Sequence, residues 1–143
     1  MAINQLSVFA ENKPGTIFSI TKCIADAGVD IRAMSVADTQ DFGILRLIVS
    51  DLEKAQNALS NDGCILSVTQ VIGVEVPDTP GGLAKVLEIL YNNSINVEYV
   101  YAFITISKKN ACVVLRVGDN DKATEILENA GVKTLTEEYV QAI

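Results

Sequence analysis

The 143-residue sequence contains no histidine. This absence excludes histidine-based acid–base chemistry, nucleophile triads that depend on histidine, and histidine metal ligands. Cysteine is also scarce: Cys23, Cys64 and Cys112 are odd in number and unclustered, and each lies in an apolar stretch. We therefore expect them to be buried small hydrophobes in a reducing cytoplasm.

Positively charged residues are fewer than negatively charged ones. Eleven Lys and Arg residues face 18 Asp and Glu residues, which gives a net charge of −7. This balance opposes binding to nucleic acid and to anionic membrane surfaces. No apolar run approaches the length of a membrane span, and the first residues lack a signal-peptide pattern. The sequence thus predicts a cytoplasmic protein with neither nucleic acid nor membrane as a partner.

The most informative stretch present is a strand-to-helix turn at residues 78–82, with sequence Asp-Thr-Pro-Gly-Gly. An apolar run at residues 71–76 precedes it, and Leu83, Val86 and Leu90 follow at helical spacing. Pro80 favours a helix start, and the free N–H groups of a first helical turn can hold an anion such as a carboxylate. The alternative is that Pro-Gly-Gly only turns the chain, since short glycine motifs are weak evidence.

The turn occurs twice. Pro14-Gly15 lies 66 positions before Pro80-Gly81, and the register continues through the following helix and strand. Beyond the next turn the offset becomes 68 and holds to the pair Gly63 and Gly131. A register kept over nearly a whole unit indicates an internal duplication. We predict two domains, at residues 1–69 and 70–143.

Hydrophobic periodicity gives the same order of elements in each copy. In the first copy we expect strands at 3–11, 29–37, 44–49 and 64–68, with helices from 16 to 27 and after a capping box at Ser50–Glu53. In the second we expect strands at 71–76, 95–106, 111–117 and 132–136, helices at 82–92 and 120–130, a hairpin at 107–110 and a helical turn at 136–139. The order β-α-β-β-α-β predicts an α+β fold of two ferredoxin-like units, each an antiparallel four-stranded sheet with two helices on one face.

Both faces of the predicted strands are largely apolar. Tyr99, Tyr101 and Phe103 share one side of their strand, whereas Val100 and Ala102 share the other. A sheet covered by helices on one side would leave its second face polar, so we expect the other copy or a second chain to cover that face. We accordingly expect one body with a shared core and a homodimer in solution.

These features resemble the ACT domain, a small ligand-binding regulatory module. The matching pattern is a strand, an (Asp/Asn)-x-Pro-Gly turn, an amphipathic helix and a (Gly/Ser)-apolar-(Asp/Asn)-apolar entry to the second strand. It is present at residues 12–15 with 28–31, and again at 78–81 with 94–97. The resemblance covers essentially the whole chain twice, and its specificity comes from order, spacing and repetition together.

The resemblance implies a regulatory protein that binds a free amino acid or similar effector where ACT units meet and acts on a separate enzyme or regulator. Carried over by position, the contacting residues are Asn12, Gly15, Thr16, Asp30 and Ile31 in the first copy, and Asp78, Gly81, Gly82, Asn96 and Val97 in the second. The first copy departs from the pattern, because an amide replaces the acid at position 12 and Lys13 follows it. We therefore expect the two copies to differ in affinity, with the smaller contribution from the first.

Other interpretations stay open at this point. Asp30 and Asn96 also fit surface positions at strand starts, and the aromatic stripe at Tyr99 is more typical of a core or interface than of a ligand wall. The acidic residues at 125, 128, 137 and 138 fit a solvated surface better than a metal site, so no cofactor or metal is expected. A small enzyme on the same frame would need a converging catalytic set, which the copies do not share. An RNA-binding sheet is opposed by the charge, and an interaction module that has lost its ligand remains an alternative.

Overall fold

The computed structural model describes residues 2–38, 41–104 and 110–143. The first unit contains β1 (Ile3–Glu11), α1 (Thr16–Asp26), β2 (Ile31–Asp38), β3 (Phe42–Val49) and α2 (Leu52–Asn61). The long strand β4 (Leu66–Pro77) joins it to the second unit, which continues with α3 (Gly82–Asn92), β5 (Val97–Ala102), β6 (Asn110–Val117), α4 (Asn120–Asn129), β7 (Lys133–Leu135) and α5 (Glu137–Ala142). The predicted pair of β-α-β-β-α-β units is confirmed.

Strand β4 belongs to both units. Its first half, up to Val71, pairs antiparallel with β1, and its second half, from Ile72, pairs with β6 and β7. The strands predicted at 64–68 and 71–76 are therefore one continuous strand, and the proposed domain boundary at residues 69 and 70 falls within it. Because no loop separates the units, the backbone of β4 fixes how they are placed relative to one another.

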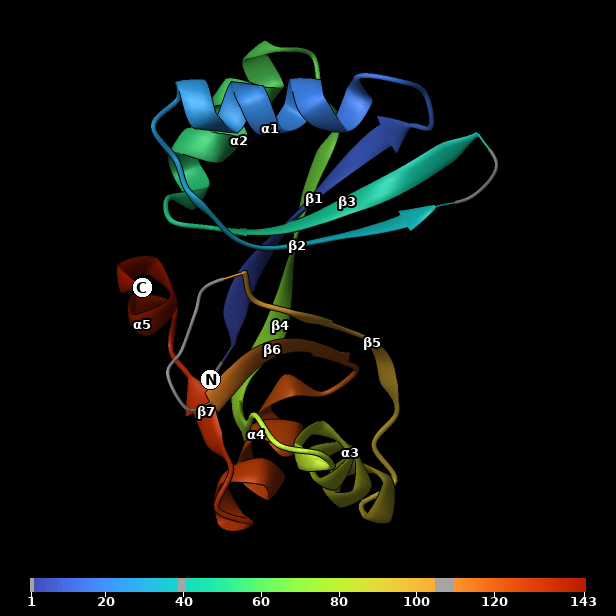
Figure 1. Ribbon diagram of the computed structural model, residues 1–143, viewed down its shortest axis with the longest axis vertical. Coiled ribbons are helices and arrows are strands. Elements are labelled where there is room, and N and C mark those ends of the chain that lie inside the picture. Colours follow the sequence, from blue (N-terminus) through green and yellow to red (C-terminus); the bar gives the residue numbers. More distant parts are fainter. Residues whose placement is uncertain (1, 39–40, 105–109) are drawn as a thin grey trace.

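The strands follow the order β2-β3-β1-β4-β6-β5, with β7 on the other side of β4. The two ends of this order meet, because Ala33 of the first unit bridges Phe103 of the second. Helices α1 and α2 lie above the first sheet and α3 and α4 below the second, so the two sheets lie between two helical layers (Figure 1).

The hydrophobic core has three parts. One lies between the first sheet and α1 and α2, and a second lies between the second sheet and α3 and α4. The third lies between the units and includes Ile3, Ile48, Val71, Phe103 and Val114. The prediction that the second copy covers part of the apolar second face is confirmed. Tyr101 packs against this inter-unit core as well, which confirms the interface interpretation of the aromatic stripe.

The C-terminal helical turn predicted at 136–139 is confirmed and extends into α5, which Thr136 caps by accepting a hydrogen bond from the Tyr139 N–H. Helix α5 packs Val140 into the inter-unit core, and the Arg32 guanidinium donates to the Gln141 carbonyl oxygen at 2.8 Å. The last helix of the second repeat thus closes one side of the interface (Figure 1).

Three expectations need correction. The capping box at Ser50 is wrong: Asp51 is the N-cap of α2 and accepts from the Lys54 N–H, whereas Ser50 Oγ accepts from the Asp30 N–H. The three cysteines are half-buried rather than fully buried, because they lie at the margins of the cores. The strand predicted at 95–106 begins later, because β5 covers Val97–Ala102, and residues 105 and 106 lie outside the described part of the chain. The hairpin predicted at 107–110 lies outside the described residues except for Asn110.

Candidate functional site

The two Pro-Gly turns have nearly the same backbone conformation. Gly15 has φ +88° and Gly81 has φ +86°, and each immediately precedes a helix. Both values lie in the left-handed region, which costs residues with a Cβ about 1–2 kcal/mol. The glycine in each Pro-Gly pair therefore sets the direction in which α1 and α3 begin.

These two helices differ from the others at their first turns. Helices α2, α4 and α5 have side-chain caps from Asp51, Asp119 and Thr136. Helices α1 and α3 begin without a side-chain cap hydrogen bond and without an acidic residue in the first turn. The partial positive charge of these two N-termini is thus left unneutralised by the local sequence, which suits a bound anion.

The first Pro-Gly turn borders a cavity of about 540 Å³ between the end of β1, the start of α1 and the turn after α2. Its polar lining includes Lys13, Thr16, Ser19 and Asp62. Among the described residues, the buried Thr16 Oγ1 has no hydrogen-bond partner. Lys13 forms an ion pair with Glu11 at 3.0 Å, but both side chains are more than half exposed, so this pair constrains Lys13 little. The cavity offers a cation, hydroxyls and a carboxylate within one concave surface.

The second copy has a smaller cavity at the equivalent place, of about 380 Å³. Three of its polar side chains contact one another: Lys133 Nζ lies 3.2 Å from Glu75 Oε2, and the Asn110 amide donates to Glu75 Oε1. Lys85 also lines this cavity. The hydrogen bond from Asn110, together with Lys133, holds the pKa of Glu75 below its ordinary value against the opposing effect of burial. The helix start is also tighter here, because a Cβ on Gly82 would lie 2.1 Å from the Pro77 carbonyl oxygen.

Within each unit, the two parts of the predicted site lie far apart. These parts are the Pro-Gly turn and the start of the following strand. The Asn12 N–H donates to the Asp41 carbonyl oxygen just before β3, whereas Asp30 hydrogen-bonds to Ser50 just after β3. A strand of this length separates its ends by about 24 Å, so Asn12, Gly15 and Thr16 lie far from Asp30 and Ile31. In the second unit β6 has the same effect, since Pro77 pairs with Asn110 at one end and Val97 with Val117 at the other.

The two strand starts differ in what surrounds them. Asp30 forms an ion pair at 2.7 Å with Arg32, whose side chain is largely buried and also reaches the Gln141 carbonyl oxygen. Asn96 lines an open depression of about 440 Å³ together with Glu98 and Lys122. The strand starts at Asp30 and Asn96 therefore form surfaces that are separate from the two Pro-Gly turns. A site that includes both a turn and a strand start must combine a turn of one unit with a strand start of another.

Sequence reasoning missed a polar cluster between the units, centred on Gln5. This side chain is fully buried, accepts from Tyr101 Oη at 2.6 Å and donates to Tyr99 Oη at 2.8 Å. The Arg46 guanidinium lies 3.9 Å from the Tyr99 ring centroid. The available signal was Gln5 followed by Ser7 on a face of β1 that also carries Ile3 and Phe9.

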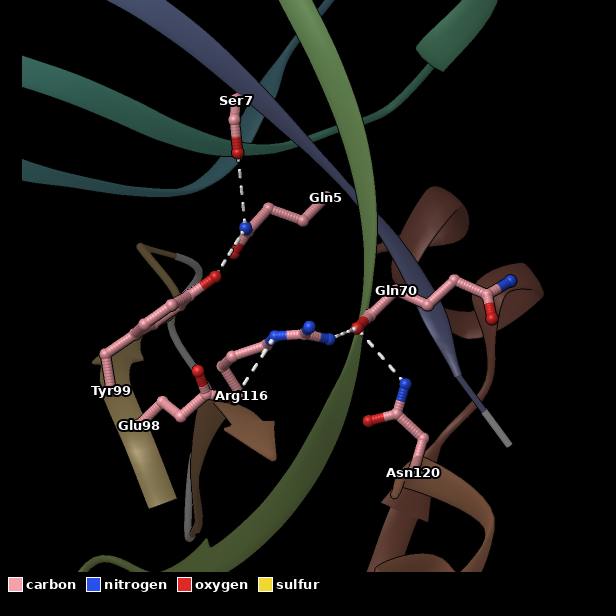
Figure 2. A network of polar contacts seen from close by, with 7 residues as sticks. All are labelled: Gln5, Ser7, Gln70, Glu98, Tyr99, Arg116 and Asn120. Carbon is pink, nitrogen blue, oxygen red and sulfur yellow. Dashed lines mark hydrogen bonds and ion pairs between the residues drawn. The ribbon is translucent and has the colours of Figure 1, made fainter. Parts of the chain in front are cut away.

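Figure 2 shows how this cluster continues toward the second unit. Arg116 donates to the Gln70 carbonyl oxygen at 2.9 Å and lies 3.6 Å from a Glu98 carboxylate oxygen, and the Asn120 amide donates to the same carbonyl oxygen at 3.1 Å. Burial raises the pKa of Tyr101 well above its ordinary value, so its hydroxyl stays protonated as a donor to Gln5. These contacts hold the units in register.

Within the described part of the chain, no group of three or more His, Cys, Asp or Glu side chains is placed to hold a metal ion. The three thiols have raised pKa values, chiefly because of burial and secondarily because of nearby carboxylates. They are therefore protonated near neutral pH, which makes them weak nucleophiles. Across the same described residues, no helix is both long and apolar enough to span a bilayer.

The fold is a fused pair of ferredoxin-like units, and comparison with known proteins identifies its family. The ACT domain pair family matches residues 1–143, so the chain belongs to this family. Protein BT0572 from Bacteroides thetaiotaomicron is 36% identical, with a TM-score of 0.92, and the match covers 100% of this chain and 98% of that one.

More distant structures share the fold. The regulatory subunit of aspartate kinase from Thermus thermophilus, in its ligand-free form, matches with a TM-score of 0.66 at 16% identity over 89% of this chain and 91% of that one. The aspartokinase alpha and beta subunits match with a TM-score of 0.58 at 20% identity over 89% and 92%. No match was found among curated proteins.

Proposed function

We propose that this ACT domain pair is a non-catalytic regulatory protein that binds a free amino acid at its Pro-Gly turns and transmits the bound state to a separate enzyme or regulator. The observation that carries the proposal is the contrast among the helices: α1 and α3 begin without a side-chain cap, whereas the other three have one. The two uncapped N-termini are those that follow the Pro-Gly turns.

In the first unit, the effector carboxylate would bind at the start of α1, near Gly15, Thr16 and Lys13. The helix N-terminus and the Lys13 ammonium both favour negative charge, and the buried Thr16 hydroxyl supplies a donor. The effector ammonium would then lie toward Asp62 across the same cavity. An α-amino acid carries both charges on one carbon, which suits this arrangement of opposite charges.

In the second unit, the carboxylate would bind at Gly81 and Gly82 and the ammonium near Asp78. Its cavity is smaller, and Glu75 in its lining is paired with Lys133, whereas Lys85 supplies a cation close to the start of α3. The larger cavity therefore favours tighter binding in the first unit. This order of affinity is opposite to the one expected from Asn12 and Lys13. We assign a lining role to the strand starts of a neighbouring unit, through Asp30 and Ile31 or through Asn96 and Val97.

The aspartate kinase regulatory subunit of the same fold supports a regulatory role, because its name gives it one. The sequence contains no histidine, the commonest general acid–base residue, which fits a binding protein better than a catalyst.

The test begins with a thermal-shift screen of the free amino acids. A ligand at one hundred times its dissociation constant adds about 2.7 kcal/mol to the free energy of unfolding, so a specific effector gives a clear rise in Tm. Calorimetry with that effector then compares Gly15→Val and Gly81→Val with wild type. The bulky side chain at each turn occupies the space of the carboxylate, and we expect loss of the corresponding binding step.

The control is Ile24→Val in the core of the first unit. Ile24 is fully buried and lies near the end of α1, so the substitution destabilises the fold at a position away from both turns and both strand starts. It should lower stability and leave the affinity unchanged. The proposal fails if no amino acid binds wild type, or if folded Gly15→Val and Gly81→Val variants bind as tightly as wild type.

A further inference from the structure

The two cavities beside the Pro-Gly turns occupy the same place in the two repeats, so their linings can be compared position by position. Strand pairing supports this alignment: Val8 pairs with Leu66 in the first unit and Val74 with Thr134 in the second, which keeps the sequence offsets of 66 and 68. Each lining combines the end of one strand, the start of the next helix and the turn after the second helix of its unit. The cavities therefore differ in their side chains and not in their fold.

The two linings differ in charge at four aligned positions. The first cavity has Phe9, Ser19, Asp62 and Ile65 where the second has Glu75, Lys85, Ala130 and Lys133. At these positions the first cavity thus has one acid beside apolar and neutral polar side chains, whereas the second has two cations and one acid. A ligand therefore meets opposite net charges at equivalent places in the two cavities.

The acid that lines the second cavity is already compensated by its neighbours. Glu75 Oε2 lies 3.2 Å from Lys133 Nζ, and the Asn110 amide donates to Glu75 Oε1. The hydrogen bond from Asn110, together with Lys133, holds the pKa of Glu75 below its ordinary value, so this carboxylate is ionised at neutral pH. Glu75 therefore balances Lys133 and leaves the positive charge of Lys85 uncompensated.

Lys85 lies at a point where the backbone also favours negative charge. It is the fourth residue of α3, a helix that begins without a side-chain cap and without an acidic residue in its first turn. Among the described residues, Lys85 forms no ion pair, whereas Lys54 near the start of α2 lies 3.9 Å from Asp51. The second cavity thus has two uncompensated positive groups, the helix start and the Lys85 ammonium.

We propose that the cavity of the second unit binds a dicarboxylate, with one carboxylate at the start of α3 and the other at Lys85. The position of the first carboxylate, at Gly81 and Gly82, rests on the proposed function. Among amino acids, the two acidic ones carry a second carboxylate, so this cavity selects them. Its volume of about 380 Å³ falls within the range of about 300–1,000 Å³ that is usual for small-molecule sites.

The first cavity has the opposite preference. Its cation, Lys13, serves the single α-carboxylate in the proposed function, whereas Ser19 supplies no charge and Asp62 supplies a negative one. A second carboxylate would lose water against the apolar side chains of Phe9 and Ile65 and would be repelled by Asp62. A neutral amino acid with an apolar side chain suits this lining better. The duplication thus gives one chain two cavities of different selectivity.

The test is calorimetry of wild type with L-glutamate, L-aspartate, succinate and L-leucine. We expect an acidic amino acid to bind, and we expect Gly81→Val but not Gly15→Val to abolish this binding. Lys85→Ser installs the side chain that the first repeat has at the aligned position, and it should weaken binding by about tenfold or more because a charged contact is lost. The matched control is Lys54→Ser, which removes the same charge near the start of another helix and should leave the affinity unchanged.

Glu75→Gln should change the affinity in the opposite direction. The substitution removes the acid of the cavity and releases Lys133 from its ion pair, so the dicarboxylate should bind more tightly. Weaker binding to this variant would contradict the charge argument. Lys85 is exposed, so Lys85→Ser is expected to fold and decides the question even if Gly81→Val does not fold.

The probes separate this inference from the proposed function. If L-leucine binds but no dicarboxylate does, the inference is wrong and amino-acid binding stands. If succinate binds with the same dependence on Lys85 and no amino acid binds, the inference holds and the proposed function fails. A dicarboxylate that binds Lys85→Ser as tightly as wild type, or that Gly15→Val displaces, overturns the inference, and the absence of any binding overturns both.

Discussion

Gln5 and Tyr101 should be energetically coupled, because a hydrogen bond joins their side chains across the two units. Tyr101 Oη donates to Gln5 Oε1 at 2.6 Å, and Gln5 is fully buried. Tyr101→Phe removes the donor and leaves a buried amide oxygen without its partner. The cost of such an unsatisfied group is about 1–3 kcal/mol, and we expect about 2 kcal/mol here because water does not reach Gln5.

Gln5→Leu removes the other member of the pair at similar volume. It leaves the hydroxyls of Tyr99 and Tyr101 without their amide partner, but these residues are only partly buried, so water can replace part of what is lost. We expect a smaller loss, of about 1 kcal/mol. In the double variant, Leu and Phe meet as apolar groups, and no buried amide is left unpaired. The double variant should therefore be less destabilised than the sum of the single variants by about 1 kcal/mol or more.

The assay is a double-mutant cycle measured by urea unfolding, with Tyr91→Phe as the control on an exposed tyrosine that is 79% accessible. The control should change the free energy of unfolding by less than about 0.5 kcal/mol. If the two single losses simply add to within about 0.5 kcal/mol, Gln5 and Tyr101 are not coupled, and the cluster does not hold the units together.

Two further predictions concern the second unit. Gly82→Ala should destabilise the protein by about 1–3 kcal/mol in thermal or chemical unfolding, because its Cβ would lie 2.1 Å from the Pro77 carbonyl oxygen. The control is Gly118→Ala, whose Cβ meets open space, and it should be neutral or slightly stabilising. Equal losses in the two variants would refute this reasoning. Glu75 has a lowered pKa in the folded protein, so its contribution to stability is complete above its ordinary pKa of 4.5 and is lost as the pH falls through the lowered value. Glu75→Gln should reduce the dependence of Tm on pH in that acidic range, and an unchanged dependence would show that the carboxylate is not stabilised by its partners.

The order of elements could be predicted because the buried positions recur at helix and strand periods in both copies. The apolar positions of α1 and α3 that reach the cores, such as Ile20 and Val86, lie at equivalent places in the repeat. The same repeat also contained the correct answer for the cap of α2. Ser50 aligns with Gly118, which has no side chain to cap a helix, whereas Asp51 aligns with Asp119, which caps α4. A comparison of the two copies would have identified Asp51.

The candidate site was less predictable, because its geometry depends on strand length and pairing rather than on local sequence. The turn at Gly15 and the entry at Asp30 are 15 positions apart in the chain, with α1 between them. Their separation in space follows from the pairing of β2 with β3, which places them at opposite ends of β3. The cavity residues Ser19 and Asp62 carried no motif, because the fold alone brings them to the turn.

The two repeats use one fold with different surfaces, and this difference follows from their places in the chain. The second repeat continues into α5, so the ion pair of Glu75 and Lys133 lies beside the Tyr139 ring of that helix. The first repeat ends in β4, which continues directly into the next unit and leaves no segment to form such a helix. At the equivalent positions the first repeat has the exposed side chains of Phe9 and Ile65, which line the first cavity. A duplicated unit that differs in this way keeps one fold while its two copies present different side chains at equivalent positions. Under the proposed function, the effect of a ligand at the first turn would reach the second unit through the shared strand β4 and through the contacts of Gln5 with Tyr99 and Tyr101.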